Sequence, residues 1–160
     1  MVISLHITNF ECYKYIVRQA FEETVHSETF EYCCSSLGLN EKEIFNMYQT
    51  IPSVAEKDNF AIELTQAVSD PSFQINNDHD LQLFLRDLIV YYVIMEGIFF
   101  YAGFAMMLAL KRVNKMIGIG QQFEFILKDE SLHLGFGCSL INTITGAKPQ
   151  KFGKGDCPQV

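Results

Sequence analysis

Two Glu-x-x-His pairs, Glu23 with His26 and Glu130 with His133, occur in a chain of 160 residues that has only four histidines. Residues three apart on an α-helix lie on one face, so a carboxylate and an imidazole at this spacing can bind the same metal ion. Helical bundles that hold two iron or manganese ions use two such pairs and add one Glu from each of two further helices. The pairs therefore predict a carboxylate-bridged pair of metal ions inside a helical bundle.

A third candidate ligand is Glu96, in an apolar run over residues 88–110 that contains no other charged residue. Burying an unpaired carboxylate in such a run would cost several kcal/mol. A divalent ion would compensate the charge and favour the ionised form. A protonated Glu, or one paired with Arg, is the alternative interpretation.

The elements that must position these residues are helices. The pattern predicts a first helix over about residues 9–37 that ends at Gly38, a residue suited to the left-handed cap. Asn40 and Glu43 have the spacing of an N-terminal cap, and they predict a second helix that Pro52 interrupts or restarts.

The second half of the chain predicts two long helices. An apolar helix is expected over about residues 80–111, followed by a short break around Gly118 and Gly120 and a last helix to about Ile144. The composition of residues 145–160 predicts a disordered tail. The expected fold class is all-α, with one domain over residues 1–144.

Each Glu-x-x-His pair lies on an apolar stripe with a helical spacing of three or four residues, as a buried ligand requires. On the first helix the stripe is Ile16, Ala20, Glu23, His26, Phe30, Cys33 and Leu37. On the last helix it is Phe123, Ile126, Glu130, His133, Gly137, Leu140 and Ile144. There are two alternatives to metal ligation: the spacing could arise by chance on a solvent-exposed helix face, or the histidines could be core residues that are satisfied by hydrogen bonds.

Composition limits the classes of function. Half of the residues are apolar and the net charge is −7, which argues against a nucleic-acid surface. Five cysteines without a Cys-x-x-Cys spacing, and no charged-then-apolar leader, predict reduced thiols in a cytoplasmic protein. The run over residues 88–110 is long enough to span a bilayer, but the other predicted helices are amphipathic, so no membrane partner is expected.

Three segments carry a family resemblance: residues 21–30, 95–101 and 129–133. They resemble the metal-binding segments of the small, radical-generating (beta) subunit of class I ribonucleotide reductase, in the same order and spacing. The resemblance covers roughly residues 13–144 and includes the connection over residues 36–45. It implies a ferritin-like helical bundle that houses two metal ions.

The resemblance also implies a role for each candidate ligand. Glu23 and Glu130 would bridge the two metal ions, His26 would complete one site, and Glu96 with His133 would complete the other. With oxygen, the metal pair would make the oxidant for reduction of ribonucleotides to deoxyribonucleotides. The implied partners are the large catalytic subunit and a second copy of the chain in a homodimer.

Two further positions have implied roles. Asp129 resembles the family's carboxylate that hydrogen-bonds a ligand histidine and connects the cofactor to the radical-transfer route; the alternative is a solvated residue. Phe30 stands where most members carry the radical tyrosine, and it has no hydroxyl. With residues 114–120, it makes the chain similar to the tyrosine-less class Ic branch, in which a manganese–iron pair stores the oxidising equivalent. A di-iron centre is the second possibility, and core packing is the alternative role for Phe30.

The resemblance includes two departures. Family members have a helix with one more carboxylate ligand before the first pair, and further helices after the last pair, so we expect a partial bundle truncated at both ends with a non-family tail over residues 145–160. We then expect the site of Glu96, Glu130 and His133 to hold metal more firmly, and the chain alone to be inactive. A stand-alone ferritin-like oxidase and a non-catalytic remnant or interaction module are the alternative functions.

Overall fold

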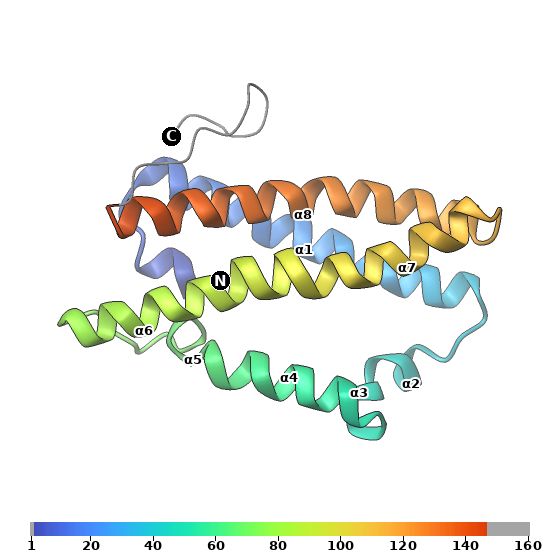
Figure 1. Cartoon of the computed structure of the whole chain (residues 1–160), viewed down its shortest axis with the longest axis horizontal. Helices are drawn as coiled ribbons and strands as arrows, with labels where there is room; N and C mark the ends of the chain where they lie inside the picture. Colours follow the sequence, from blue (N-terminus) through green and yellow to red (C-terminus); the bar gives the residue numbers. More distant parts are fainter. Residues whose placement is uncertain (1, 147–160) are drawn as a thin grey trace.

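The computed structural model describes residues 2–146, which form helices and no strands (Figure 1). Three long helical rods lie beside one another: α1, α8, and a continuous rod made of α6, η2 and α7. The elements in chain order are η1 (Val2–Leu5), α1 (Phe10–Ser36), α2 (Glu41–Phe45), α3 (Met47–Thr50), α4 (Pro52–Leu64), α5 (Gln66–Ser69), α6 (Asp78–Ile89), η2 (Val90–Phe99), α7 (Phe100–Arg112) and α8 (Ile117–Ile144). The all-α, ferritin-like class is confirmed.

Helix α1 has the limits that its end signals predict. The side chain of Asn9 accepts a hydrogen bond from the backbone N–H of Cys12, which satisfies one of the unpaired donors of the first turn. After the helix, Gly38 has a φ of +68°, a conformation that L side chains rarely adopt. These two residues hold both ends of the helix that carries the first Glu-x-x-His pair.

The predicted second helix is correct at its start but is shorter than expected. Asn40 accepts a hydrogen bond from the backbone N–H of Lys42 and donates one from its side chain to the Glu43 carboxylate. Helix α2 ends at Phe45, and the short α3 follows before Pro52 opens α4. Pro at the first turn of α4 fits because its missing N–H would be unpaired there in any case.

The long apolar helix has the predicted extent, but its middle is not an α-helix. Residues Val90–Phe99 form the π-helix η2, between α6 and α7. A π-helix pairs residue i with residue i+5 instead of i+4 and so changes which side chains face the core; such segments occur frequently at functional sites. Glu96 lies within this segment and is buried.

The predicted break at Gly118 and Gly120 is wrong in position. The turn lies at residues 113–116, where Asn114 and Met116 adopt left-handed φ values of 58° and 53°. Both glycines belong to α8. Gly120 serves packing instead, because a Cβ built on it would lie 2.7 Å from Cβ of Lys111. The predicted tail over residues 145–160 falls almost entirely outside the described residues.

The core lies where the three rods meet. Its buried members are Ile3, Ile16, Val68, Phe84, Leu88, Tyr92, Phe136 and Leu140. Tyr92 of η2 packs directly on α8 at Gly137, where a Cβ would lie 2.1 Å from Cγ of the Tyr92 ring. A glycine is therefore required at this contact, which sets the distance between the two rods that carry Glu96 and Glu130.

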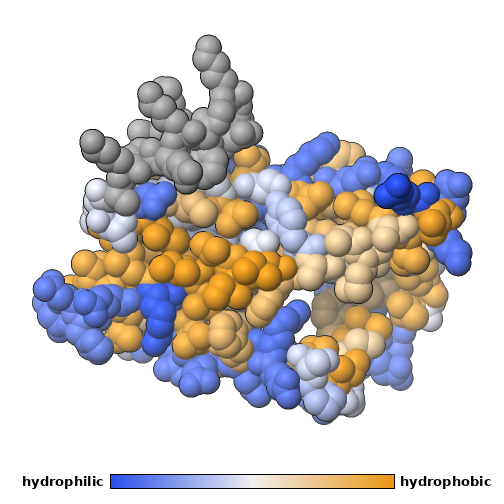
Figure 2. Space-filling model, viewed as in Figure 1, coloured by the Kyte–Doolittle hydropathy of each residue, from blue (hydrophilic) through white to orange (hydrophobic). Residues whose placement is uncertain are grey.

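A broad apolar area crosses the middle of the face in Figure 2, over the α6–η2–α7 rod. Within the described residues, the rod Asp78–Arg112 is one helix that is long and apolar enough to cross a membrane. Such a finding is weak evidence for a membrane span, since core helices of soluble proteins have the same length and composition.

Candidate metal centre

The two Glu-x-x-His pairs lie on facing helices, and Glu96 approaches them from a third. Glu23 and His26 belong to α1, Glu130 and His133 to α8, and Glu96 to η2. All of them are buried except Glu23, which is half-buried. The core-facing stripes of the sequence thus place two imidazoles and three carboxylates in one interior cluster.

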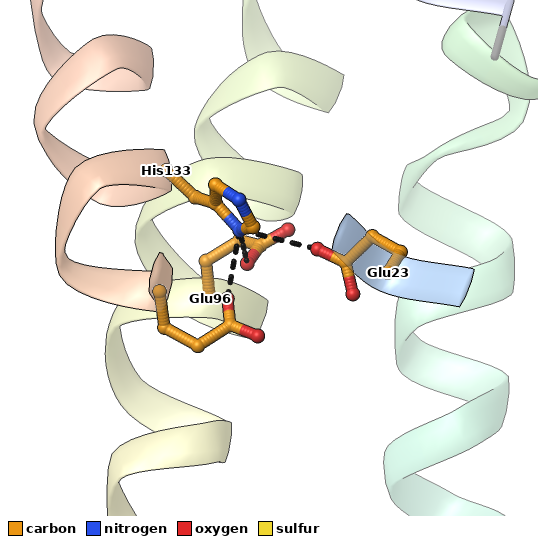
Figure 3. Close-up of side chains that lie close together, drawn as sticks. Glu23, Glu96 and His133 are labelled. Atoms are coloured by element: carbon orange, nitrogen blue, oxygen red, sulfur yellow. Dashed lines mark hydrogen bonds and ion pairs between the residues drawn. The ribbon is translucent and has the colours of Figure 1, made fainter. Parts of the chain in front are cut away.

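His133 faces three carboxylates with its Nδ1 atom. Figure 3 shows Glu23 and Glu96 pointing toward its ring from two different helices. Its Nδ1 atom lies 3.1 Å from Glu130 Oε2, 3.2 Å from Glu23 Oε1 and 3.5 Å from Glu96 Oε2. One ligand atom from each of these four residues falls within 4.8 Å of the others, so a single metal ion can contact all four.

His26 faces the same two shared carboxylates through their other oxygens. Its Nδ1 atom lies 3.1 Å from Glu130 Oε1 and 3.6 Å from Glu23 Oε2. Each of Glu23 and Glu130 therefore turns one oxygen toward His26 and the other toward His133. This is the arrangement that a carboxylate needs in order to bridge two metal ions.

The donor set fits divalent iron or manganese. Glu23 Oε1, His26 Nδ1 and Glu96 Oε2 are buried and make no hydrogen bond within the described part of the chain. Buried polar atoms are rarely left in this state, since each costs free energy. Carboxylate and imidazole ligands suit both metals, and a bound ion would satisfy all three atoms.

The shared site pushes the pKa values of its carboxylates apart. Burial, together with the neighbouring Glu130, raises the pKa of Glu96. Burial would also raise the pKa of Glu130, but the neighbouring imidazoles of His133 and His26 outweigh it and lower that pKa. Burial would raise the pKa of Glu23 as well, but the same two histidines lower it.

The histidines respond in the opposite direction. Burial would lower the pKa of His26, but the neighbouring carboxylates of Glu130, Glu23 and Asp129 raise it to about 10. The pKa of His133 is raised for the same reason, by the neighbouring carboxylates of Glu130, Glu23, Glu96 and Glu22. Because the neighbouring carboxylates favour the protonated rings, and a ligand imidazole must be deprotonated, a metal ion competes with protons at both histidines.

Sequence reasoning missed the residue that orients Glu96. Gln19 is fully buried, and its side-chain amide donates hydrogen bonds to Glu96 Oε1 at 3.2 Å and to the Tyr91 hydroxyl at 3.4 Å. The Tyr92 hydroxyl donates to Gln19 Oε1 at 3.1 Å, which fixes the direction of the amide. Because Gln19 holds Oε1, Oε2 of Glu96 faces His133. Gln19 lies four residues before Glu23 and so on the same face of α1, although the predicted stripe placed Ala20 there instead; the spacing could have identified it.

The two other sequence candidates lie at the edge of the centre. Asp129 Oδ2 lies 3.2 Å from His26 Nε2, on the side of the ring away from the shared carboxylates. Phe30 is half-buried, and its ring packs 5.6 Å from that of Phe123. The corresponding outer nitrogen of His133 lies 3.0 Å from Glu22 Oε2, a carboxylate that the sequence analysis did not select.

A helical bundle with histidines and shared carboxylates in its interior is the architecture of the ferritin-like proteins. The family model for the ribonucleotide reductase small chain matches residues 1–156. The chain therefore belongs to the ribonucleotide reductase small-subunit family, an oxidoreductase family.

The relatives include proteins from bacteria, eukaryotes and a virus. The chain is 51% identical over 150 residues to ribonucleoside-diphosphate reductase subunit beta of Chlamydia pneumoniae. The aligned region covers 94% of this chain and 43% of that protein. It is 30% identical over 150 residues to the subunit beta of Treponema pallidum, covering 94% of this chain and 41% of that protein. It is 30% identical over 125 residues to ribonucleoside-diphosphate reductase small chain 1 of Saccharomyces cerevisiae, and this match covers 76% of this chain and 28% of that protein. The chain thus spans less than half the length of these relatives.

Proposed function

We propose that this chain houses the two-metal cofactor of a ribonucleoside-diphosphate reductase small subunit, which reacts with oxygen to give the oxidant for making deoxyribonucleotides from ribonucleotides. The main support for the proposal is that the two oxygens of each shared carboxylate face different histidines. Glu23 and Glu130 both direct one oxygen to His26 and the other to His133. Two ions bound there would be bridged by both carboxylates.

The ligand set follows from the side of the centre that each residue faces. His26 would bind one ion and His133 the other, both through Nδ1, since these atoms face the shared carboxylates. Glu96 would bind the ion at His133, because its free Oε2 atom points to that ring. The site at His133 then has three carboxylates and the site at His26 has two.

The protein's own contribution is to orient ligands and control protons. The bound metal pair would supply the one-electron oxidant. Gln19 holds Glu96 in a single orientation, and burial keeps water from competing for the ligands. Asp129 fixes the ring of His26 and, with its side chain 36% exposed, links the centre to the protein surface. We assign it the family's role in radical transfer.

The metals that we propose are manganese and iron together, with two irons as the second possibility. Phe30 has no hydroxyl, so the position of the usual radical tyrosine cannot store an oxidising equivalent as a phenoxyl radical. Its ring packs on Phe123, which in turn packs on Phe104. The missing hydroxyl at this position is what favours the class Ic branch, in which the metal pair itself stores that equivalent.

The partners that we propose are those of the family: the large catalytic subunit, and a second copy of the small subunit, in the cytoplasm. Since the chain spans 43% of its Chlamydia pneumoniae relative, we expect nucleotide reduction only when the segments that it does not match are also present. The chain alone would bind metal but would not support turnover.

The experiment loads the full chain with Mn²⁺ and Fe²⁺ under argon, adds air, and follows oxygen uptake. Deoxyribonucleotide formation is then measured with a large subunit, with and without co-expressed segments covering the rest of a family member. We expect reduction only with those segments; reduction by the chain and large subunit alone would contradict this dependence. Sustained oxygen turnover without a large subunit would instead favour a stand-alone oxidase, and absence of specific metal binding would favour a remnant.

A further inference from the structure

We propose that Glu22 is a positioning residue that holds the ring of His133 as Asp129 holds that of His26. Each helix would then carry a five-residue motif, acid-Glu-x-x-His, whose acidic first residue serves the histidine of the opposite helix. The inference rests on the proposed metal site and deepens it, because it assigns an outer partner to the second histidine.

The geometry on the two sides is reciprocal. Asp129 of α8 lies 3.2 Å from Nε2 of His26 on α1. Glu22 of α1 lies 3.0 Å from Nε2 of His133 on α8. In both rings Nδ1 faces the shared carboxylates and Nε2 faces the acid that directly precedes one of them.

This reciprocity has a consequence for the protonation of each ring. A neutral imidazole carries its hydrogen on one nitrogen and has a lone pair on the other. When Nε2–H is donated to an outer carboxylate, the lone pair stays on Nδ1, where a metal ion would bind. Glu22 therefore selects the tautomer of His133 that can act as a ligand, and it limits rotation of the ring.

A second contact directs Glu22 toward His133. Arg18, one helical turn earlier on α1, lies with Nε 2.8 Å from Glu22 Oε1. This guanidinium holds one carboxylate oxygen and leaves Oε2 for the histidine. The side chain of Arg18 is 66% exposed and that of Glu22 is 15% exposed. Arg18 therefore holds Glu22 from the solvent side, and Glu22 lies between Arg18 and the ring of His133.

The sequence contains the same repeat. Residues 22–26 read Glu-Glu-Thr-Val-His and residues 129–133 read Asp-Glu-Ser-Leu-His. In an α-helix the residue before the ligand Glu is displaced by 100° around the axis, since a turn holds 3.6 residues. It therefore points to one side of the stripe, where Nε2 of the histidine on the opposite helix lies.

The test titrates the full chain with Mn²⁺ alone, by calorimetry, and compares the wild type with Glu22→Ala, Glu22→Gln and Arg18→Met. Glu28→Ala is the control, because Glu28 is an exposed acid on the same helix. We expect Glu22→Ala to weaken the site at His133 by about 10- to 100-fold, the usual effect of losing an outer partner. Glu22→Gln should recover part of the loss, since its amide oxygen can accept the ring N–H, and Arg18→Met should lose less.

A spectroscopic measurement separates orientation from folding. In the chain loaded with diamagnetic Zn²⁺, the Nε2–H proton of His133 should exchange slowly with water in the wild type and faster in Glu22→Ala. Asp129→Ala should instead affect the ring proton of His26. A purely structural role would lower the melting temperature of the metal-free chain and leave the difference between the two ring protons unchanged.

The outcomes distinguish this inference from the proposed function. A wild-type chain that binds no Mn²⁺ would contradict both the role of Glu22 and the proposed function. Specific binding by the wild type, with Glu22→Ala indistinguishable from Glu28→Ala, would overturn the role of Glu22 alone. If Glu22→Ala loses helix content, Glu22→Gln and Arg18→Met decide the matter: wild-type affinity and slow ring-proton exchange in both would overturn the role.

Discussion

The His26 and His133 sides of the centre share two carboxylates and differ in a third. His133 faces Glu23, Glu130 and Glu96, whereas His26 faces only the first two with its inner nitrogen. A divalent ion is held mainly by the charges and lone pairs around it, so the third carboxylate favours the His133 side. Similar sequence motifs on two helices therefore need not give equal sites, because a residue from a third helix can distinguish them.

The largest effect is expected from removing a carboxylate that both sides share. Glu130→Ala deletes the oxygens that lie 3.1 Å from each histidine Nδ1 atom. We expect loss of both metal ions, and loss of any stabilisation that metal gives to the fold, since binding free energy adds to folding free energy. Elemental analysis after desalting and melting with added Mn²⁺ measure both effects. Unchanged metal content would contradict the bridging role.

The second prediction removes the carboxylate that only one side has. Glu96→Ala leaves His133 with the same two carboxylates as His26, so the affinity at His133 should fall to about that of the His26 side and the difference between the two sites should disappear. The measurement is the pair of stepwise affinities for Mn²⁺, by calorimetric titration. Glu63→Ala is a control, since this residue lies on α4, away from the cluster. A loss equal to that of Glu130→Ala would mean that the two sites fill only together.

The third prediction concerns pH and the metal-free chain. The folded pKa of His26 is raised from 6.5 to about 10, so its stabilising contribution is complete below pH 6.5 and is lost as pH rises through 10. The raised pKa of Glu96 acts with the same sign. The lowered pKa of Glu130 contributes throughout this window and is lost only in strong acid.

The melting temperature of the metal-free chain should therefore fall between pH 7 and pH 10. Metal binding requires the deprotonated rings, so stabilisation by Mn²⁺ should grow over the same range. Calorimetric melting with and without metal measures both trends. A melting temperature of the metal-free chain that rises with pH would contradict the protonated state of the cluster.

The smallest effect is expected from Asp129→Asn, which keeps the shape of the outer partner of His26 and removes its charge. The amide oxygen can still accept the ring N–H, so we expect a loss of affinity at the His26 site toward the lower end of about 10- to 100-fold. The site at His133 should be unchanged. Competition with a chromophoric chelator resolves the two sites; an equal loss at both would mean that the sides do not act separately.

The sequence predicted the helices and their inward faces better than their interruptions. The limits of α1 could be predicted because Asn9 and Gly38 act within a few residues of its ends. The π-helix at Glu96 and the turn at residues 113–116 could not, since they depend on how the rods pack. Gly120 shows the reason: its neighbourhood was expected to break the helix, but it permits the close approach of Lys111.

The site shows the same division. The ligands predicted from i, i+3 spacing and from one charge in an apolar run lie together in the interior. The residues that orient them, Gln19 and Glu22, were missed because each is defined by a contact more than seventy residues away in sequence. Spacing on one helix indicates which side chains share a face, and it does not indicate what the opposite helix presents.

The most direct test of a shared two-metal site is the metal content of the full chain, loaded with Mn²⁺ and Fe²⁺ together and measured by elemental analysis. The prediction is about two ions per chain in the wild type and almost none in Glu130→Ala. A wild type that retains no more metal than Glu130→Ala would contradict the assignment of Glu23, His26, Glu96, Glu130 and His133 as ligands.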